Sequence, residues 1–262
     1  MSAIILHDEI IHYEVLGRGR PLLFIHDWVG TWRYWIPNMQ AASLSYRAYA
    51  LDLWGFGDSA KKTTNYPLEQ QCLLLDEFMD SMGIGKIALI GHGLGAVLAI
   101  LYTQQHSDRV DRVMAVGYPW AEQAINPRLY TASPAELAEW LFDRVPSNET
   151  ARTEIHKVDP GAVQVSLSDA KQVHLLELPK QIENPLLLVH GSNDPAIAPP
   201  DLDEIALWSE NTHCILFDQS GHYPMLDETS KFNRLLTDFL ILNSGSSPRQ
   251  LQLKEEWKRR VR

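Results

Sequence analysis

The sequence contains only two cysteines among its 262 residues, Cys72 and Cys214. They lie in a helix-like and a strand-like stretch, so a disulfide framework is not expected, and both are predicted to be buried thiols in a reducing compartment. No apolar run reaches the roughly 18 residues of a membrane-spanning helix, and the first residues lack the basic start and apolar core of a secretory signal. We therefore expect a cytoplasmic protein without membrane insertion.

Positive charge is scarce outside the end of the sequence. The net charge is −10, but residues 249–262 hold six Lys or Arg against two Glu, which leaves −14 on the rest of the chain. An acidic body argues against nucleic-acid binding. The basic tail is predicted to be a solvated helix packed by Trp257, and the alternative is a tail that contacts an anionic partner. The ten histidines form no H-E-x-x-H or comparable cluster, so we expect no metal and no cofactor.

Buried strands alternate with helical patterns along most of the chain. Two short strands are predicted within 3–15, joined by a turn at His7-Asp8. Later apolar runs predict strands at 21–26, 47–52, 86–91, 111–118, 185–191 and 212–218, and helices near 33–43, 67–83, 94–106, 201–208 and 228–242. This alternation predicts an α/β fold, with a mostly parallel sheet of about eight strands and helices on both faces.

Residues 119–179 interrupt the alternation with six prolines and no strong strand. Ser133 and Glu136 form a capping box at the start of one helix, and further helices are expected at 149–157 and 168–177. A helical insertion of this length between two sheet strands predicts a lid rather than a second domain. The expected organisation is therefore a core of residues 1–118 and 180–243, a helical lid at 119–179, and a linker with the basic tail at 244–262.

The residues directly after the strands are the candidates for a site, because open α/β sheets bind ligands at the carboxyl ends of their strands. The stretch IALIGHGLGAVLAI predicts a strand, a sharp turn and a helix, the frame in which a G-x-S-x-G elbow presents a nucleophilic serine. The central residue here is Gly93. Asp194 and His222 follow further along the chain, in the order of an acid and a histidine.

Five motifs together resemble the α/β-hydrolase fold superfamily, in its small-lidded branch of esterases, haloperoxidase-like enzymes and carbon–carbon hydrolases. They are LLFIHDWVG, DLWGFGDS, IGHGLGA, LLLVHGSND and SGHYPMLD, within residues 10–242. The resemblance implies that Asp194 is the triad acid, that His222 is the triad base and that Gly93 is a vacant nucleophile position. It also implies an oxyanion hole made by the backbone N–H groups of Leu94 and Trp28.

Asp27 departs from the family pattern, because glycine is common at its place in the turn. A carboxylate in the oxyanion hole would repel a developing negative charge, so Asp27 is expected to face away. The loop from Asp52 to Ser59 matches the D-x-x-G-x-G-x-S pattern of the family and is interpreted as structural. An apolar substrate pocket is predicted, with core and lid packing as the alternative for each lining residue: His26, Trp32, Trp54, Tyr118 and Trp140.

Gly93 removes the atom that would attack a carbonyl, so acyl-enzyme catalysis at this position is excluded. Loss of the nucleophile in other triad enzymes costs about a million-fold in turnover. Three hypotheses remain. The chain is a hydrolase of a small, largely apolar, ester-like substrate, either through water activated by His222 or as a serine-to-glycine variant of an active parent. Alternatively, it is a non-catalytic small-molecule binding protein, or an interaction protein that uses its tail. Assembly as a homodimer is left open.

Overall fold

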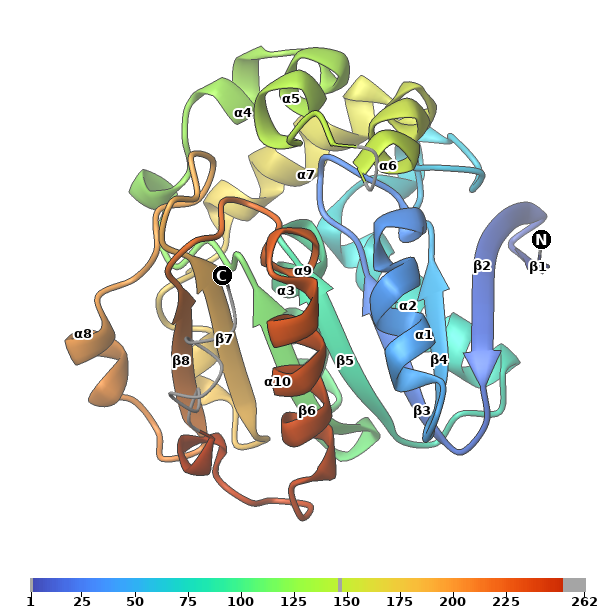
Figure 1. The fold of residues 1–262 in the computed structure, drawn as a ribbon. Coiled ribbons are helices and arrows are strands. Elements are labelled where there is room, and N and C mark those ends of the chain that lie inside the picture. Colours follow the sequence, from blue (N-terminus) through green and yellow to red (C-terminus); the bar gives the residue numbers. More distant parts are fainter. Residues whose placement is uncertain (1, 146–147, 252–262) are drawn as a thin grey trace.

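The computed structural model describes residues 2–145 and 148–251 (Figure 1). Eight strands form one sheet in the order β1-β2-β4-β3-β5-β6-β7-β8. The strands are β1 (Ser2–Leu6), β2 (Glu9–Gly17), β3 (Arg20–Ile25), β4 (Tyr46–Leu51), β5 (Ile87–His92), β6 (Val110–Val116), β7 (Leu186–Gly191) and β8 (Thr212–Phe217). The pairs β1–β2 and β2–β4 are antiparallel, and the other five pairs are parallel. The predicted fold class is confirmed.

Helices cover both faces of the sheet (Figure 1). Every residue of β5 and β7 is buried, as expected of parallel strands between two helical layers. The helices outside the segment between β6 and β7 are α1 (Ile36–Ala42), α2 (Leu68–Ser81), α3 (Leu94–Gln105), α8 (Leu202–Ala206), α9 (Pro224–Asp227) and α10 (Thr229–Ile241). Short 3-10 turns lie at η1 (Trp32–Trp35), η2 (Thr63–Asn65), η3 (Ser107–Arg109), η4 (Glu122–Ala124), η6 (Ile155–Lys157), η7 (Pro179–Gln181) and η8 (Pro248–Gln250).

The amino-terminal hairpin has the predicted turn. His7 and Asp8 both have positive φ, 50° and 62°, which is the geometry of a two-residue hairpin turn that follows the twist of its strands. Leu6 pairs with Glu9 directly across that turn. The single helix expected near 33–43 is instead η1 followed by α1, and Pro37 lies in the first turn of α1, where its missing N–H is not needed.

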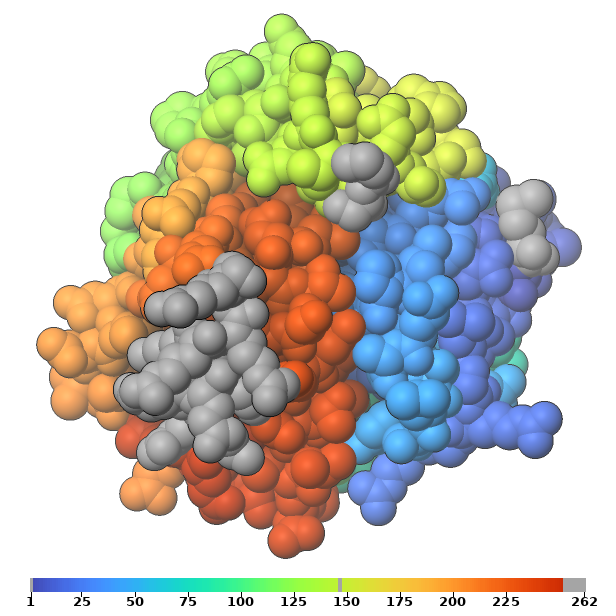
Figure 2. Space-filling model, viewed as in Figure 1, coloured from blue at the N-terminus to red at the C-terminus, as the bar shows by residue number. Residues whose placement is uncertain are grey.

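Residues 119–179, called the helical segment below, lie over the carboxyl end of the sheet (Figure 1). In the space-filling view they rest directly on the parts of the chain beneath them (Figure 2). The segment contains α4 (Arg128–Thr131), α5 (Pro134–Leu141), α6 (Glu149–Glu154) and α7 (Pro160–Gln172). The capping box at Ser133 is confirmed, but the helix expected at 168–177 is misplaced. Asp159 caps α7 by accepting a hydrogen bond from the Gly161 N–H, so this helix starts earlier and ends at Gln172.

Other expectations concern features outside the sheet. Cys72 and Cys214 are free and buried, and burial raises the pKa of each thiol to about 12. No helix among the described residues has the length and apolar character needed to cross a membrane. Most of the predicted basic tail, including Trp257, lies outside the described residues. Arg249, at its start, donates hydrogen bonds to backbone carbonyls of residues 206–212.

Candidate active site

The turn between β5 and α3 has the sharp geometry that the sequence predicted. Gly93 has φ 49° and ψ −107°. Glycine adopts this conformation without a steric penalty, whereas any other residue adopts it only with backbone strain. Its neighbours allow a close approach of backbones. A Cβ atom on Gly91 would lie 2.1 Å from the Gly95 carbonyl oxygen, and one on Gly95 would lie 2.3 Å from the Ile25 carbonyl oxygen. The three glycines therefore let α3 begin tightly against β3 and β5.

The space beside Gly93 is filled by Asp27, which follows β3. A Cβ atom built on Gly93 would lie only 1.6 Å from Oδ1 of Asp27. Asp27 is fully buried. The expectation that Asp27 faces away from the site is therefore wrong: its carboxylate lies where a side chain at position 93 would begin.

Hydrogen-bond donors explain why the carboxylate points inward. Oδ1 of Asp27 accepts a bond from the Leu94 N–H at 3.1 Å, and Oδ2 accepts one from the Val29 N–H at 3.2 Å. The Trp28 N–H also helps to lower the pKa of this carboxyl group. Buried N–H groups without partners are costly, and the first N–H groups of a helix favour negative charge. With no side chain at Gly93, the carboxylate accepts hydrogen bonds from Leu94, one of the two predicted oxyanion-hole donors, and from Val29, the residue after the other predicted donor, Trp28.

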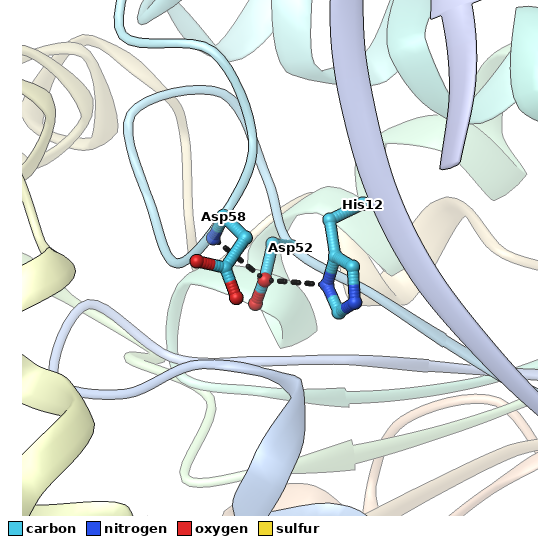
Figure 3. A group of neighbouring side chains, drawn as sticks. All are labelled: His12, Asp52 and Asp58. Carbon is cyan, nitrogen blue, oxygen red and sulfur yellow. Dashed lines mark hydrogen bonds and ion pairs between the residues drawn. The ribbon is translucent and has the colours of Figure 1, made fainter. Parts of the chain in front are cut away.

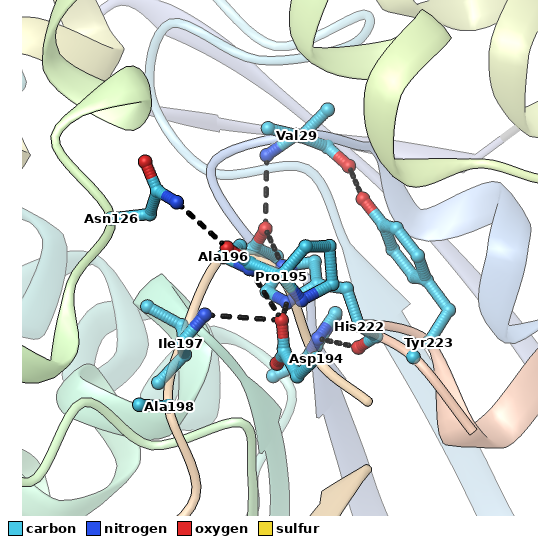
Figure 4. Close-up of polar contacts among 12 residues, drawn as sticks. Val29, Asn126, Asp194, Pro195, Ala196, Ile197, Ala198, His222 and Tyr223 are labelled. Carbon is cyan, nitrogen blue, oxygen red and sulfur yellow. Dashed lines mark hydrogen bonds and ion pairs between the residues drawn. The ribbon is translucent and has the colours of Figure 1, made fainter. Parts of the chain in front are cut away.

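His222 connects Asp27 to the predicted acid. Nδ1 of His222 lies 2.9 Å from Oδ2 of Asp194, and Nε2 lies 3.0 Å from Oδ2 of Asp27. Asp194 is held in turn by the N–H groups of Ala196 and Ile197, at 2.8 and 3.0 Å (Figure 4). The structure thus brings together the two residues that the sequence singled out after β7 and β8. A ring that bonds a carboxylate through each nitrogen donates from both, which is the imidazolium form.

The electrostatics agree with a charged ring. Burial by itself lowers the pKa of His222, but the charges and hydrogen bonds of Asp194 and Asp27 outweigh it and raise the pKa to about 10. Burial raises the pKa of the Asp27 carboxyl group, yet the His222 hydrogen bond and charge hold it well below its usual range. At neutral pH the site is therefore an imidazolium between two carboxylates. Such a ring has no lone pair with which to take a proton from water.

His92, next to the turn, is a structural link. Its Nε2 donates to the His222 carbonyl oxygen at 2.9 Å, and its Nδ1 lies 3.1 Å from the Tyr34 hydroxyl. The same hydroxyl accepts a bond from the Asp27 N–H at 2.7 Å. Burial lowers the pKa of His92 to about 3, so this ring is neutral. The hydroxyl of Tyr223, a residue of the SGHYPMLD motif, donates to the Val29 carbonyl oxygen. No role for the Tyr34 and Tyr223 hydroxyls was expected from the sequence, because both fix backbone groups, and a sequence motif does not reveal such contacts.

The five predicted pocket residues make contacts within the protein. His26 donates from Nδ1 to the Asp27 carbonyl oxygen at 2.7 Å and accepts at Nε2 from the Leu53 N–H at 3.0 Å. The Tyr118 hydroxyl donates to the Leu175 carbonyl oxygen. The remaining tryptophans are buried or half-buried, with Trp32 beside His12, Trp54 in the loop after β4 and Trp140 against Arg128. A pocket role for these residues stays a prediction.

His12, Asp52 and Asp58 lie close enough together to hold a cation (Figure 3). Their oxygen atoms already have partners. Oδ2 of Asp52 lies 2.9 Å from His12 Nδ1 and accepts a bond from the Asp58 N–H at 3.0 Å, while Asp58 pairs with Lys157. A Cβ atom on Gly57 would lie 2.1 Å from Asp52 Oδ2, so the loop folds closely around this carboxylate. These contacts agree with the structural interpretation of the Asp52–Ser59 loop.

Comparisons with known proteins identify the class. A profile of the alpha/beta hydrolase fold family matches residues 20–155, and the chain belongs to that family. It is 25% identical to the pimeloyl-[acyl-carrier protein] methyl ester esterase of Vibrio cholerae, over 87% of this chain and 97% of that protein. It is 29% identical to a soluble epoxide hydrolase of Corynebacterium, over 43% of this chain and 42% of that protein. An esterase structure from Exiguobacterium antarcticum superposes with a TM-score of 0.81 at 17% identity, covering 91% of this chain and 98% of the other.

The contact between Gly93 and Asp27 makes a prediction about esterase activity. Gly93→Ser alone is expected to give no hydrolysis of p-nitrophenyl acetate, because the new Cβ and the Asp27 carboxylate would occupy the same space. The double variant Gly93→Ser, Asp27→Gly is expected to hydrolyse this ester at least about 100-fold faster than Gly93→Ser alone. This is a small part of the roughly million-fold effect that a serine nucleophile has in other triad enzymes. Asp27→Gly alone is the control. Equal activity in Gly93→Ser and the double variant would contradict the steric argument.

The paired carboxylates make a second prediction, for titration of His222. Nitrogen NMR chemical shifts should show an imidazolium at pH 7 and deprotonation near pH 10. Because the folded pKa lies above the ordinary value of 6.5, the pairing stabilises the fold fully below about pH 6.5, and this contribution is lost as the pH rises toward 10. Asp27→Asn should lower the His222 pKa by removing one carboxylate. A ring already neutral at pH 7 in the unmodified protein would contradict the assignment.

Proposed function

We propose that this protein is a hydrolase of a small, largely apolar substrate, in which the Asp27 carboxylate takes the part of the absent serine. One observation carries the proposal: Asp27 Oδ1 lies where a side chain at Gly93 would begin, and Asp27 Oδ2 lies 3.0 Å from His222 Nε2. Carboxylates act as covalent nucleophiles in several enzyme classes. His222 and Asp194 keep their places beside this group, and the backbone donors at Leu94 and Val29 face it.

The two routes considered from the sequence fit this site poorly. An acyl-enzyme at position 93 is excluded because Gly93 has no side chain. Hydrolysis by water that His222 activates needs a neutral ring, and the two carboxylates keep the ring protonated at neutral pH. The Asp27 carboxylate also fills the place of the water. A carboxylate, in contrast, is already deprotonated and needs no base before it attacks.

The substrate is a small molecule with an ester-like electrophilic carbon. The relatives support this class in part, since one is named as a methyl ester esterase and another as an epoxide hydrolase. The free, buried thiols Cys72 and Cys214 favour action in a reducing compartment such as the cytoplasm. Assembly as a homodimer and recruitment of a partner by the tail remain predictions, as does the role of the helical segment as a lid.

A non-catalytic binding protein is the second candidate. The observation that favours it is the closed site: Asp27 and Leu94 are fully buried, and His222 is 2% exposed. In addition, a carboxyl group with a strongly lowered pKa is a weak nucleophile. A ligand reaches the site only when a covering element moves. The hydrogen bond from Trp28 Nε1 to Ser166 Oγ of α7, at 3.0 Å, is one contact that such an opening would break.

Turnover assays with a panel of small esters, lactones and epoxides test the proposal. The native chain is expected to hydrolyse at least one member, and Asp27→Asn is expected to lower turnover at least about 10³-fold, as loss of a nucleophile does. Asp8→Asn is the matched control, because it makes the same chemical change in an exposed turn where asparagine tolerates positive φ. If calorimetry detects binding of a panel member and no member is turned over, the binding-protein candidate replaces this proposal.

A further inference from the structure

A cavity lies at the end of the sheet opposite the candidate active site. It opens at the amino ends of β3, β4, β5 and β6, beside the carboxyl end of α10, whereas the helical segment covers the other end of the sheet (Figure 1). Its volume is about 290 Å³. At roughly 30 Å³ for a group the size of a water molecule, this is room for a ligand of about eight to ten heavy atoms.

The cavity has an apolar inner wall and a charged mouth. Ile87, Ala88 and Leu240 line it and are only 1%, 6% and 3% exposed, so they lie at its inner end. Arg20 and Lys86 line the same cavity but are exposed, so they lie at its mouth. A ligand that matches this arrangement has an apolar body and a negative group at one end.

The two cations at the mouth lie on neighbouring strands. Arg20 and Lys86 each come two residues before a paired position, Leu22 of β3 and Ala88 of β5, so they are at the same level of the sheet. Neither side chain forms a hydrogen bond or an ion pair with another described residue. Like charges that face each other across neighbouring strands repel, and an anion between them removes this repulsion.

A carboxylate also lines the cavity, that of Asp111, but it is already engaged. Its Oδ2 lies 2.6 Å from Arg112 Nε, and its Oδ1 accepts a bond from the Ser244 hydroxyl at 2.9 Å. Burial raises the pKa of this carboxyl group, but these hydrogen bonds and the charges of Arg112 and Lys86 outweigh burial and keep the pKa below its ordinary value. Because Arg112 neutralises Asp111, the charges of Arg20 and Lys86 remain for a ligand.

Two side chains fix the shape of the cavity by binding the end of α10. Arg112, which is 1% exposed, donates to the carbonyl oxygens of Phe239 and Leu242. The Tyr46 hydroxyl donates to the Leu240 carbonyl oxygen at 2.8 Å. Carbonyl groups at the end of a helix have no donor within the helix, so these contacts satisfy them. A ligand therefore meets a preformed cavity, and little affinity is lost to ordering of its walls.

We propose that this cavity binds a small amphipathic carboxylate, whose anionic group lies between Arg20 and Lys86 and whose alkyl body fills the space against Leu240. The chain has a net charge of −10, so an anion is repelled by most of the protein and attracted to this exposed pair. The site is separate from the candidate active site, and the proposal does not depend on the proposed function.

The surroundings favour a carboxylate over phosphate. Inorganic phosphate has no apolar body, so it would leave the inner wall of the cavity in contact with water. The negative end of α10 and the Asp111 carboxylate also border the cavity, and they repel a doubly charged group more strongly than a singly charged one. A single negative group at the mouth, with an alkyl chain inside, avoids both costs.

Calorimetric titration of the full-length protein with straight-chain carboxylates tests the proposal. Octanoate is expected to bind at one site per chain, with affinity that rises about fourfold for each methylene added from butanoate to octanoate. Hexanol, which lacks the charge, is expected to bind at least about 10-fold more weakly than hexanoate, and inorganic phosphate at least about 10-fold more weakly than octanoate. Octanoate affinity should fall as the salt concentration rises, because the cations are exposed.

Variants locate the bound carboxylate. The double variant Arg20→Ala, Lys86→Ala is expected to lower octanoate affinity at least about 10-fold. The matched control Arg18→Ala, Lys62→Ala removes the same two charges from exposed positions outside the cavity and should bind octanoate as the native chain does. Ala88→Phe fills the apolar space and should abolish binding although both cations remain. Circular dichroism checks that each variant is folded, and the exposed double variant decides the matter if Ala88→Phe does not fold.

Three results would overturn the proposal. Octanoate that binds the native chain and the Arg20→Ala, Lys86→Ala variant equally well is bound elsewhere, for example in the candidate active site. Hexanol or inorganic phosphate that binds as tightly as the matching carboxylate excludes an amphipathic anion as the ligand. Absence of saturable binding for every carboxylate in the series excludes the site.

Discussion

The ion pair between Asp27 and His222 is the interaction on which the site depends. A buried charge is costly unless it has an opposite charge and hydrogen bonds. Asp27 has both, through His222 and the N–H groups of Leu94 and Val29, and His222 has Asp194 on its other side. Breaking a buried pair by removal of one partner typically costs about 3–5 kcal/mol. The turn after β3, the start of α3 and the loop after β8 are therefore fixed relative to one another by charge as well as by packing.

The fold was predictable from local patterns. Runs such as Leu186–Gly191 are apolar along their length because helices cover both faces of the sheet, and the right-handed crossover rule leaves few ways to join such strands. The helical segment was less predictable. The start of α7 depends on a cap at Asp159, and its short helices pack through contacts with other parts of the chain, such as that between Trp28 and Ser166. Periodicity within a window of sequence contains no information about such contacts.

The site was predictable only in part, for a similar reason. Asp194 and His222 follow strands that end at the same edge of the sheet, so order along the chain was enough to pair them. The direction of the Asp27 side chain depends on Leu94 and His222, which are 67 and 195 residues away. The expectation that Asp27 faces away assumed that an oxyanion forms when a serine attacks a carbonyl group. Without a serine at position 93, no oxyanion forms in this way, so the carboxylate is not repelled. The sequence signal for this arrangement was the combination of two departures from the family pattern: Asp27 at a position where glycine is common, and Gly93 at the position where the nucleophile is common.

The close approach at Gly93 also restricts the order in which such a site can arise. A chain with serine at position 93 and glycine at position 27 must change two residues to reach the present pair. If the aspartate came first, its carboxylate and the serine side chain would overlap, as the 1.6 Å separation from a Cβ atom indicates. If the serine were lost first, the turn would keep its shape with a small unfilled space. Of the two orders of substitution, only loss of the serine before gain of the aspartate avoids a steric clash. Reversal by mutagenesis would likewise require replacement of Asp27 by glycine before serine is introduced at position 93.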